Sequence, residues 1–252
     1  MSWLELEGAV NVRDLGGLPT VDGRTTRSGV LVRADNLQDL TPKDVEVLQN
    51  HGVRTVLDLR TAPEVEITGP GPLKSTDVTH VHLDLIPHGF EAREGDDLIE
   101  KAIPHEDAGD EAMDHFYIDY VNHAPAEVAT ALRTIADPHS GAVLVHCAAG
   151  KDRTGVICAL ALSLVGVTRQ AIVDDYVRTD ERIAAVRDRL LATELYNHDM
   201  ARRSLDSLRL HGENMERFLD RVDATYGGPH GLAMSIGVDE ETVAKLSRRL
   251  LG

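Results

Sequence analysis

Short apolar runs bounded by turn residues recur along the first part of the chain and predict β-strands. Gly29–Arg33 follows a turn at Asp22–Gly23, and the apolar residues there are too few for a buried helix. Three later runs have the same character: Thr55–Asp58, His80–Asp84 and Ala142–Val145. Each is short enough and rich enough in valine and leucine to form a strand in the middle of a sheet.

Helical patterns lie between these runs. Thr41 has the position of an N-cap, Pro42 that of the first helical residue, and Asp44 lies three residues after the cap. Gly52 then marks the end of this helix. Pro125–Ile135 has its apolar side chains on one stripe, as expected of a helix that packs on a sheet.

Beyond the strand that ends at Val145, the chain reads as helix almost to its end. Apolar stripes at helical spacing comprise Ile183, Val186 and Leu190; Leu219 and Val222; and Val243, Leu246 and Leu250. We therefore predict an α/β fold with a central, largely parallel sheet flanked by helices and a helical C-terminal region, in a single domain over residues 1–252. The polar segment from about 87 to 109 is predicted to be a surface loop.

The charge and the cysteine content limit the partners and the compartment. The chain has 26 basic and 42 acidic residues, a net charge of −16, which argues against nucleic acid as a partner. The only cysteines, Cys147 and Cys158, form no disulfide framework, so a reducing compartment is expected. The acidic N-terminus lacks a signal-peptide pattern, and the longest apolar stretch is too short to span a bilayer. We expect a cytoplasmic protein without stable membrane insertion, and export without a cleaved signal stays open.

The strongest chemical signal is the segment His146–Gly155, which reads HCAAGKDRTG. A buried strand leads into it and an apolar helix follows, so backbone N–H groups and the positive end of a helix dipole surround one point. Such a site binds a tetrahedral dianion and favours the thiolate form of Cys147, which becomes a nucleophile aimed at phosphorus. Arg153 follows after five intervening residues and is expected to bind two phosphate oxygens.

The other residues of this loop are expected to hold the phosphate. We assign substrate binding to Ala148, Ala149, Gly150, Lys151 and Thr154. Gly150 allows a tight loop, Thr154 is placed to hydrogen-bond the thiolate, and His146 is expected to order the loop and favour ionisation of the thiol.

This segment resembles the signature loop of the cysteine-based protein tyrosine phosphatases, and its GKDRTG ending resembles their atypical bacterial, PtpB-like branch. Further segments agree with that branch in the same order: Asn11–Gly17, Arg27–Arg33, Asp58–Arg60 and Asp175–Val177. The resemblance implies a phosphatase that needs no metal or other cofactor and works through a phosphocysteine. In some relatives the activity extends from phosphotyrosine to phosphoserine, phosphothreonine and phosphoinositides.

The general acid that protonates the leaving oxygen has two candidates. Asp152 matches the aspartate that the atypical branch is thought to use, and Asp84, at the end of a predicted strand, is the alternative. Lys151 adds a cation that suits a more highly charged substrate, so a phosphoinositide or inositol-phosphate phosphatase is the alternative function. A phosphate-binding pseudophosphatase is the rival from another class, but it would be expected to have a damaged loop.

Three further expectations concern positions outside the loop. The resemblance makes residues 181–226 a candidate helical lid, although ordinary surface helices explain their pattern equally well. Arg60 and Glu64 are predicted to form a structural ion pair. Asn11–Gly17, which contains Arg13 and Asp14, is predicted to be a turn with an ion pair, and the resemblance makes it a structural segment close to the site.

Overall fold

The centre of the molecule is a six-stranded sheet in the order β1-β2-β3-β6-β4-β5. The computed structural model describes residues 2–86 and 110–252, so the predicted loop at 87–109 lies outside the described residues. The strands are β1 Ser2–Trp3, β2 Arg13–Asp14, β3 Leu31–Ala34, β4 Val53–Asp58, β5 Thr79–His82 and β6 Ala142–His146. The pairs β3–β6, β6–β4 and β4–β5 are parallel, whereas β1 and β2 are antiparallel additions. The predicted largely parallel sheet is confirmed.

Helices pack on both faces of this sheet. Successive side chains of β6 point to opposite faces: Val143 and Val145 enter the larger core, and Ala142 and Leu144 the smaller. The larger core includes α3 (Asp110–His123), α4 (Pro125–Ala136), α5 (Asp152–Leu164) and α6 (Arg169–Val177). The smaller core lies against α1 (Pro42–Asn50) and the 3-10 turn η1 (Pro72–Ser75). Both faces of the central strands are therefore buried, which explains their continuous apolar sequences.

Local sequence signals set the starts of the helices that follow β3 and β4. Thr41 and Asp44 form the predicted capping box of α1, with Pro42 in its first turn. Thr61 and Glu64 form a second capping box at α2 (Ala62–Thr68), a helix that the sequence patterns had not indicated. Because α2 follows β4 directly, this cap places Glu64 beyond the end of the sheet.

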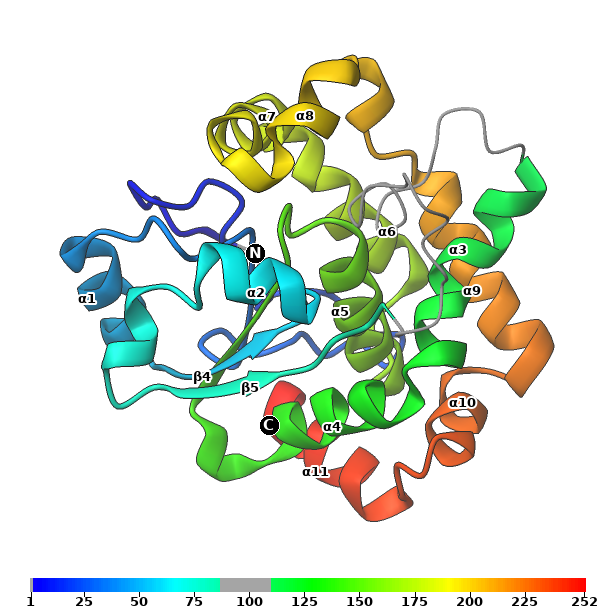
Figure 1. The fold of residues 1–252 in the computed structure, drawn as a ribbon. Helices are drawn as coiled ribbons and strands as arrows, with labels where there is room; N and C mark the ends of the chain where they lie inside the picture. Colours follow the sequence, from blue (N-terminus) through cyan, green and yellow to red (C-terminus); the bar gives the residue numbers. More distant parts are fainter. Residues whose placement is uncertain (1, 87–109) are drawn as a thin grey trace.

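The rest of the chain is helical, as predicted. It forms α7 (Ile183–Ala192), α8 (Glu194–Arg202), α9 (Gly212–Tyr226), α10 (Pro229–Ser235) and α11 (Glu240–Leu251), with the 3-10 turns η3 (Arg178–Arg182) and η4 (Asp206–Leu208). A further 3-10 turn, η2 (Pro138–Ser140), lies between α4 and β6. All the side chains of the three predicted apolar stripes are buried. The pair α7–α8 lies on the opposite side of the molecule from α4, α10 and α11 (Figure 1).

The turn predicted over Asn11–Gly17 holds only in part, and the ion pair predicted there is wrong. Arg13 and Asp14 form β2, the turn is confined to Gly16–Gly17, and the two charged side chains do not pair with each other. The Arg13 guanidinium pairs with Asp175, and the Asp14 carboxylate is 2.7 Å from the imidazole of His51. Neighbouring strand residues point to opposite sides of a sheet, so their charges meet different elements. None of the helices built from residues 2–86 and 110–252 has the length and apolar character needed to cross a bilayer.

Candidate active site

The loop that joins β6 to α5 has its backbone carbonyls turned away from its centre. The carbonyl of Ala148 accepts from the Asn36 N–H at 3.0 Å, and the Asn11 side-chain amide donates to the carbonyls of Ala149 and Gly150 at 3.0 and 3.2 Å. Within the part of the chain that the structure describes, the N–H groups of residues 148–153 donate to no backbone carbonyl. Turning the carbonyls outward leaves these N–H groups and the N-terminus of α5 as a cradle for an anion.

Gly150 is required for this loop by its conformation and by space. Its φ of +65° lies in the left-handed region, which other residues rarely adopt. A Cβ at this position would lie 2.4 Å from the carbonyl oxygen of Ala34. The loop therefore packs directly on the end of β3, and the absence of a Cβ at Gly150 is what allows this contact.

A buried network of two arginines and one aspartate supports the loop from below. The Asp175 carboxylate accepts from Arg13 at 2.8 Å and from Arg33 at 2.6 Å, and Arg33 also donates to the Gly150 carbonyl at 2.7 Å. Arg13 in turn donates to the side chain of Asn11. Burial tends to raise the pKa of Asp175, but the two guanidinium groups outweigh it and hold that pKa below its usual value. The network keeps one net positive charge beneath the loop.

The thiol of Cys147 lies at the centre of the cradle and is only 3% exposed. The Thr154 hydroxyl is 3.2 Å from its sulfur and donates to it, the contact expected of this threonine. His146 is fully buried, with Nδ1 3.2 Å from the Cys147 carbonyl and Nε2 3.5 Å from an oxygen of Asp58. Burial lowers the pKa of His146 to about 4, so the imidazole is neutral at pH 7. His146 therefore contacts the loop backbone without adding a full positive charge beside the sulfur.

Arg153 forms an ion pair that the sequence patterns did not predict. Its two terminal nitrogens donate to the Glu64 carboxylate at 2.7 and 3.1 Å, and Tyr196 of α8 donates to the same carboxylate at 3.0 Å. The predicted Arg60–Glu64 pair is wrong, because Arg60 instead binds Asp58 at 2.6 Å. The capping box turns Glu64 toward the loop, whereas Arg60 lies before the helix and folds back on its own strand.

The two candidates for the general acid lie in different surroundings. Asp152 is the first residue of α5 and lines the cavity beside Cys147, with Oδ1 accepting from the Tyr117 hydroxyl at 2.5 Å. Asp84 instead accepts from the backbone N–H groups of Ala62 and Ile86 and borders a separate hollow. Because its carboxylate caps backbone groups there, the structure does not bring Asp84 to the thiol among the described residues.

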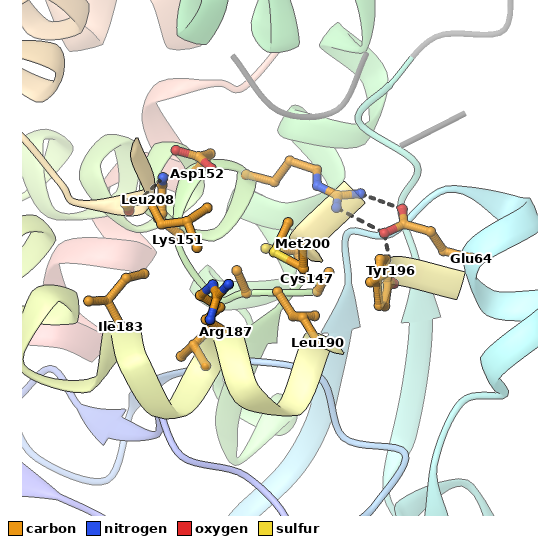
Figure 2. Close-up of a pocket in the computed structure, with 14 residues that line it drawn as sticks. Glu64, Cys147, Lys151, Asp152, Ile183, Arg187, Leu190, Tyr196, Met200 and Leu208 are labelled. Carbon is orange, nitrogen blue, oxygen red and sulfur yellow. Dashed lines mark hydrogen bonds and ion pairs between the residues drawn. The ribbon is translucent and has the colours of Figure 1, made fainter. Parts of the chain in front are cut away.

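The cavity at the thiol has about 40 Å³ of free volume, room for only a few water molecules. In Figure 2, Lys151 and Asp152 lie to one side of Cys147, and Glu64 and Tyr196 lie to the other. The opposite wall comes from α7, α8 and η4 and consists of Ile183, Val186, Arg187, Leu190, Tyr196, Met200 and Leu208.

Two cations, Lys151 and Arg187, line this cavity, and among the described residues neither donates a hydrogen bond to a carboxylate. The Lys151 ammonium donates to the carbonyl of Leu208 at 3.2 Å and lies 4.0 Å from Asp152. The buried Nε of Arg187 has no hydrogen-bond partner among the described residues, and its Nη2 makes a 3.4 Å contact with the carbonyl of Arg203. In a chain with a net charge of −16, cations gathered around one small cavity favour an anionic ligand.

The remaining cysteine and the histidines show no second site in the described ranges. Burial raises the pKa of Cys158 to about 12, so this thiol stays protonated and packs as an apolar group. Across residues 2–86 and 110–252, no three histidine, cysteine, aspartate or glutamate side chains are grouped in a way that could hold a metal ion.

Sequence reasoning gave no role to several residues of the site. Asn11, Arg33 and Asp175 lie inside the segments that carried the resemblance, and an arginine in the apolar run before Ala34 was a usable signal. A charged side chain in a buried strand must meet a partner, but the sequence does not name that partner. Glu64 was expected to meet a different arginine, and Tyr117 had no distinguishing pattern.

Comparison with known proteins agrees with this geometry. The model of the tyrosine phosphatase family matches residues 4–252. The triple specificity protein phosphatase PtpB of Mycobacterium tuberculosis is 30% identical over 287 aligned residues, covering 100% of both chains. A tyrosine-protein phosphatase of Nostoc commune is 31% identical over 227 residues, covering 87% of this chain and 73% of its own.

Two solved structures are similar at lower identity. TpbA of P. aeruginosa is 19% identical with a TM-score of 0.37, covering 79% of this chain and 89% of its own. The core catalytic domain of the PP-IP phosphatase SIW14 from S. cerevisiae is 16% identical with a TM-score of 0.39, covering 71% and 78%. The family match over nearly the whole length, with the full-length relative, shows that this chain belongs to the tyrosine phosphatase family.

Proposed function

We propose that the chain hydrolyses phosphotyrosine, and also phosphoserine and phosphothreonine, through a phosphocysteine on Cys147. The sulfur attacks phosphorus, the S–P bond forms, and the P–O bond to the leaving group breaks. Asp152 gives its proton to the leaving oxygen. A water molecule then attacks the phosphocysteine, with Asp152 accepting a proton, and releases inorganic phosphate and the thiolate.

The observation that carries this proposal is the loop beside the sulfur of Cys147, in which the carbonyls of Ala148, Ala149 and Gly150 are held by donors outside the loop. These bonds turn the carbonyls outward, so the N–H groups are left preorganised for phosphate oxygens. The guanidinium of Arg153, oriented by Glu64, is proposed to bind two of these oxygens while phosphate transfers. A pseudophosphatase would not need an intact thiol and Thr154 together.

We propose further that residues 181–226, above all α7 and α8, act as a lid in a single phosphatase domain of residues 1–252. Side chains of α7 and α8 line the small cavity of about 40 Å³ at the thiol, which supports a wall that moves when substrate enters. A covered thiolate is also protected from oxidants. Both cysteines are free and buried, which suits a reducing, cytoplasmic setting.

A second candidate function, hydrolysis of phosphoinositides or inositol phosphates, is favoured by Lys151 and Arg187. These two cations border the cavity in addition to Arg153 and could bind a second phosphate on the same molecule. A phosphotyrosine side chain carries a single phosphate, so it offers Lys151 and Arg187 no second phosphate to bind. The relative from M. tuberculosis, which is named for triple specificity, supports testing both classes.

The catalytic proposal is tested with an aryl phosphate. We expect vanadate-sensitive hydrolysis that is lost in Cys147→Ser and kept in Cys158→Ser, which changes the other buried thiol. Retained turnover in Cys147→Ser would contradict the proposal. A phosphorylated enzyme trapped by acid quench in the wild type, and absent from the serine variant, would identify the covalent intermediate.

The choice of substrate is tested by comparing kcat/KM on a phosphotyrosine peptide and on vesicles that contain a bisphosphorylated inositol lipid. If Lys151 and Arg187 bind a second phosphate, Lys151→Ala and Arg187→Ala should lower kcat/KM on the vesicles about 10-fold or more while changing the peptide less than about 3-fold. Equal losses of kcat/KM on both substrates would show that the two cations contact only the phosphate that is cleaved.

A further inference from the structure

Tyr117 makes a short hydrogen bond to the carboxylate of Asp152. Its hydroxyl is 2.5 Å from Oδ1, and the side chain comes from α3. The ring of Tyr117 is 4% exposed and packs edge-on against Tyr176 and Phe218, with ring centroids 6.1 and 6.3 Å apart. The hydroxyl is therefore held by packing as well as by its hydrogen bond.

A second tyrosine supports the first. The hydroxyl of Tyr176 is 2.6 Å from that of Tyr117, and the side chain of Asn214 hydrogen-bonds to Tyr176. The single proton of Tyr117 goes to the carboxylate, so Tyr176 must donate to Tyr117. Burial raises the pKa of both phenols, which keeps them protonated as donors. The result is a directed chain of hydrogen bonds that ends on Oδ1 of Asp152.

This chain leaves one carboxylate oxygen of Asp152 for chemistry. Oδ2 is 4.0 Å from the ammonium of Lys151, a residue that also lines the cavity. With Oδ1 held by Tyr117, the carboxyl group cannot exchange its two oxygens without losing a buried hydrogen bond.

We propose that Tyr117, supported by Tyr176, is the positioning residue for proton transfer by Asp152, because it binds Oδ1 and leaves Oδ2 to carry the proton to the leaving oxygen. The inference rests on the proposed role of Asp152. As the proton departs, negative charge develops on the carboxylate, and the hydrogen bond from Tyr117 becomes charge-assisted and stronger. An interaction that strengthens in the transition state accelerates the step instead of only stabilising the fold.

The test compares leaving groups. Tyr117→Phe keeps the ring and removes the hydroxyl. We expect kcat to fall about 10-fold or more on phenyl phosphate, whose leaving group needs a proton, and less than about 3-fold on a dinitrophenyl phosphate, whose leaving group does not. KM should stay within about 2-fold on both substrates. Tyr226→Phe is the matched control, because that hydroxyl bonds to the exposed Asn122.

A double variant separates positioning from general destabilisation. In an Asp152→Asn background, Tyr117→Phe should cause no further loss, because the group that Tyr117 serves is already gone. The inference would be overturned if the double variant lost kcat by the product of the two single losses. It would also be overturned if Tyr117→Phe lowered kcat equally for both leaving groups. Should Tyr117→Phe fail to fold, Tyr176→Phe provides the same test, with a smaller loss in the same direction expected.

Failure of this inference can be distinguished from failure of the proposed function. If hydrolysis depends on Cys147 and on Asp152 but shows no leaving-group bias in Tyr117→Phe, only the positioning role is wrong. If Asp152→Asn itself shows no leaving-group bias, the proposed acid is wrong and the role of Tyr117 falls with it.

Discussion

Replacing Glu64 by glutamine should destabilise the protein strongly, because it removes the charge that faces Arg153. Glutamine keeps the size of the side chain and one oxygen for Tyr196. It cannot make the ion pair that now joins Glu64 to Arg153 at 2.7 and 3.1 Å. Both side chains are about 6% exposed, so little water is available to replace the lost partner.

The size of the loss follows from the acidity of Glu64. Burial would raise the pKa of this group, but the charge and hydrogen bonds of Arg153 outweigh burial and lower the pKa from 4.5 to about 2. A shift of that size corresponds to about 3 kcal/mol of stability at pH 7, since one pKa unit is about 1.4 kcal/mol. Removing one partner of a buried pair typically costs about 3–5 kcal/mol, which agrees. Because the pKa is lowered on folding, this stability is present above about pH 4.5 and is lost as the pH falls toward 2.

Urea unfolding of wild type and Glu64→Gln measures this difference directly. We expect a gap of about 3 kcal/mol in the free energy of unfolding at pH 7, and a Tm lower by about 6–12 °C. The gap should shrink as the pH falls below 4.5 in the range where the wild type is still folded. Glu66→Gln, an exposed position two residues along α2, is the control and should change little. A gap below about 1 kcal/mol at pH 7 would refute the reasoning, as would a gap that does not change with pH.

Three further variants test separate contacts of the site. Thr154→Val removes the hydroxyl donor 3.2 Å from the sulfur and should slow hydrolysis of the phosphocysteine about 10-fold. Rapid-mixing experiments should then show a burst of aryl product. No burst is expected if this hydrogen bond does not contribute to the hydrolysis step. Gly150→Ala should abolish vanadate binding and should lower the free energy of unfolding more than Gly69→Ala does. Both glycines have positive φ, but only a Cβ at position 150 would lie 2.4 Å from a backbone oxygen. Equal losses of stability in the two variants would contradict this steric argument. Tyr196→Phe removes a hydrogen bond between α8 and the loop's ion pair and should speed alkylation of Cys147 by iodoacetamide about 5-fold, whereas an unchanged rate would show that α8 does not limit access.

The sequence by itself was enough to predict the four strands β3, β4, β5 and β6 and the glycine-containing loop that follows the last of them. The capping box at Thr41 depends on contacts within a few residues, and the positive φ of Gly150 is likewise a local property of its loop. Such local contacts act wherever the segment lies in the fold, so their patterns can be read directly along the chain. The parallel sheet followed for the same reason, because strands that alternate with helices have few other arrangements.

Only the tertiary structure decided which charges meet. Glu64 and Arg153 are far apart in sequence, as are Arg13 and Asp175, and their pairing depends on how whole helices and strands are placed. The sequence suggested nearby partners for Arg13 and Glu64, and both suggestions were wrong. The contact of Tyr117 with the proposed acid also arises from packing between helices. Buried polar groups need partners, but only the folded chain determines which partner is within reach.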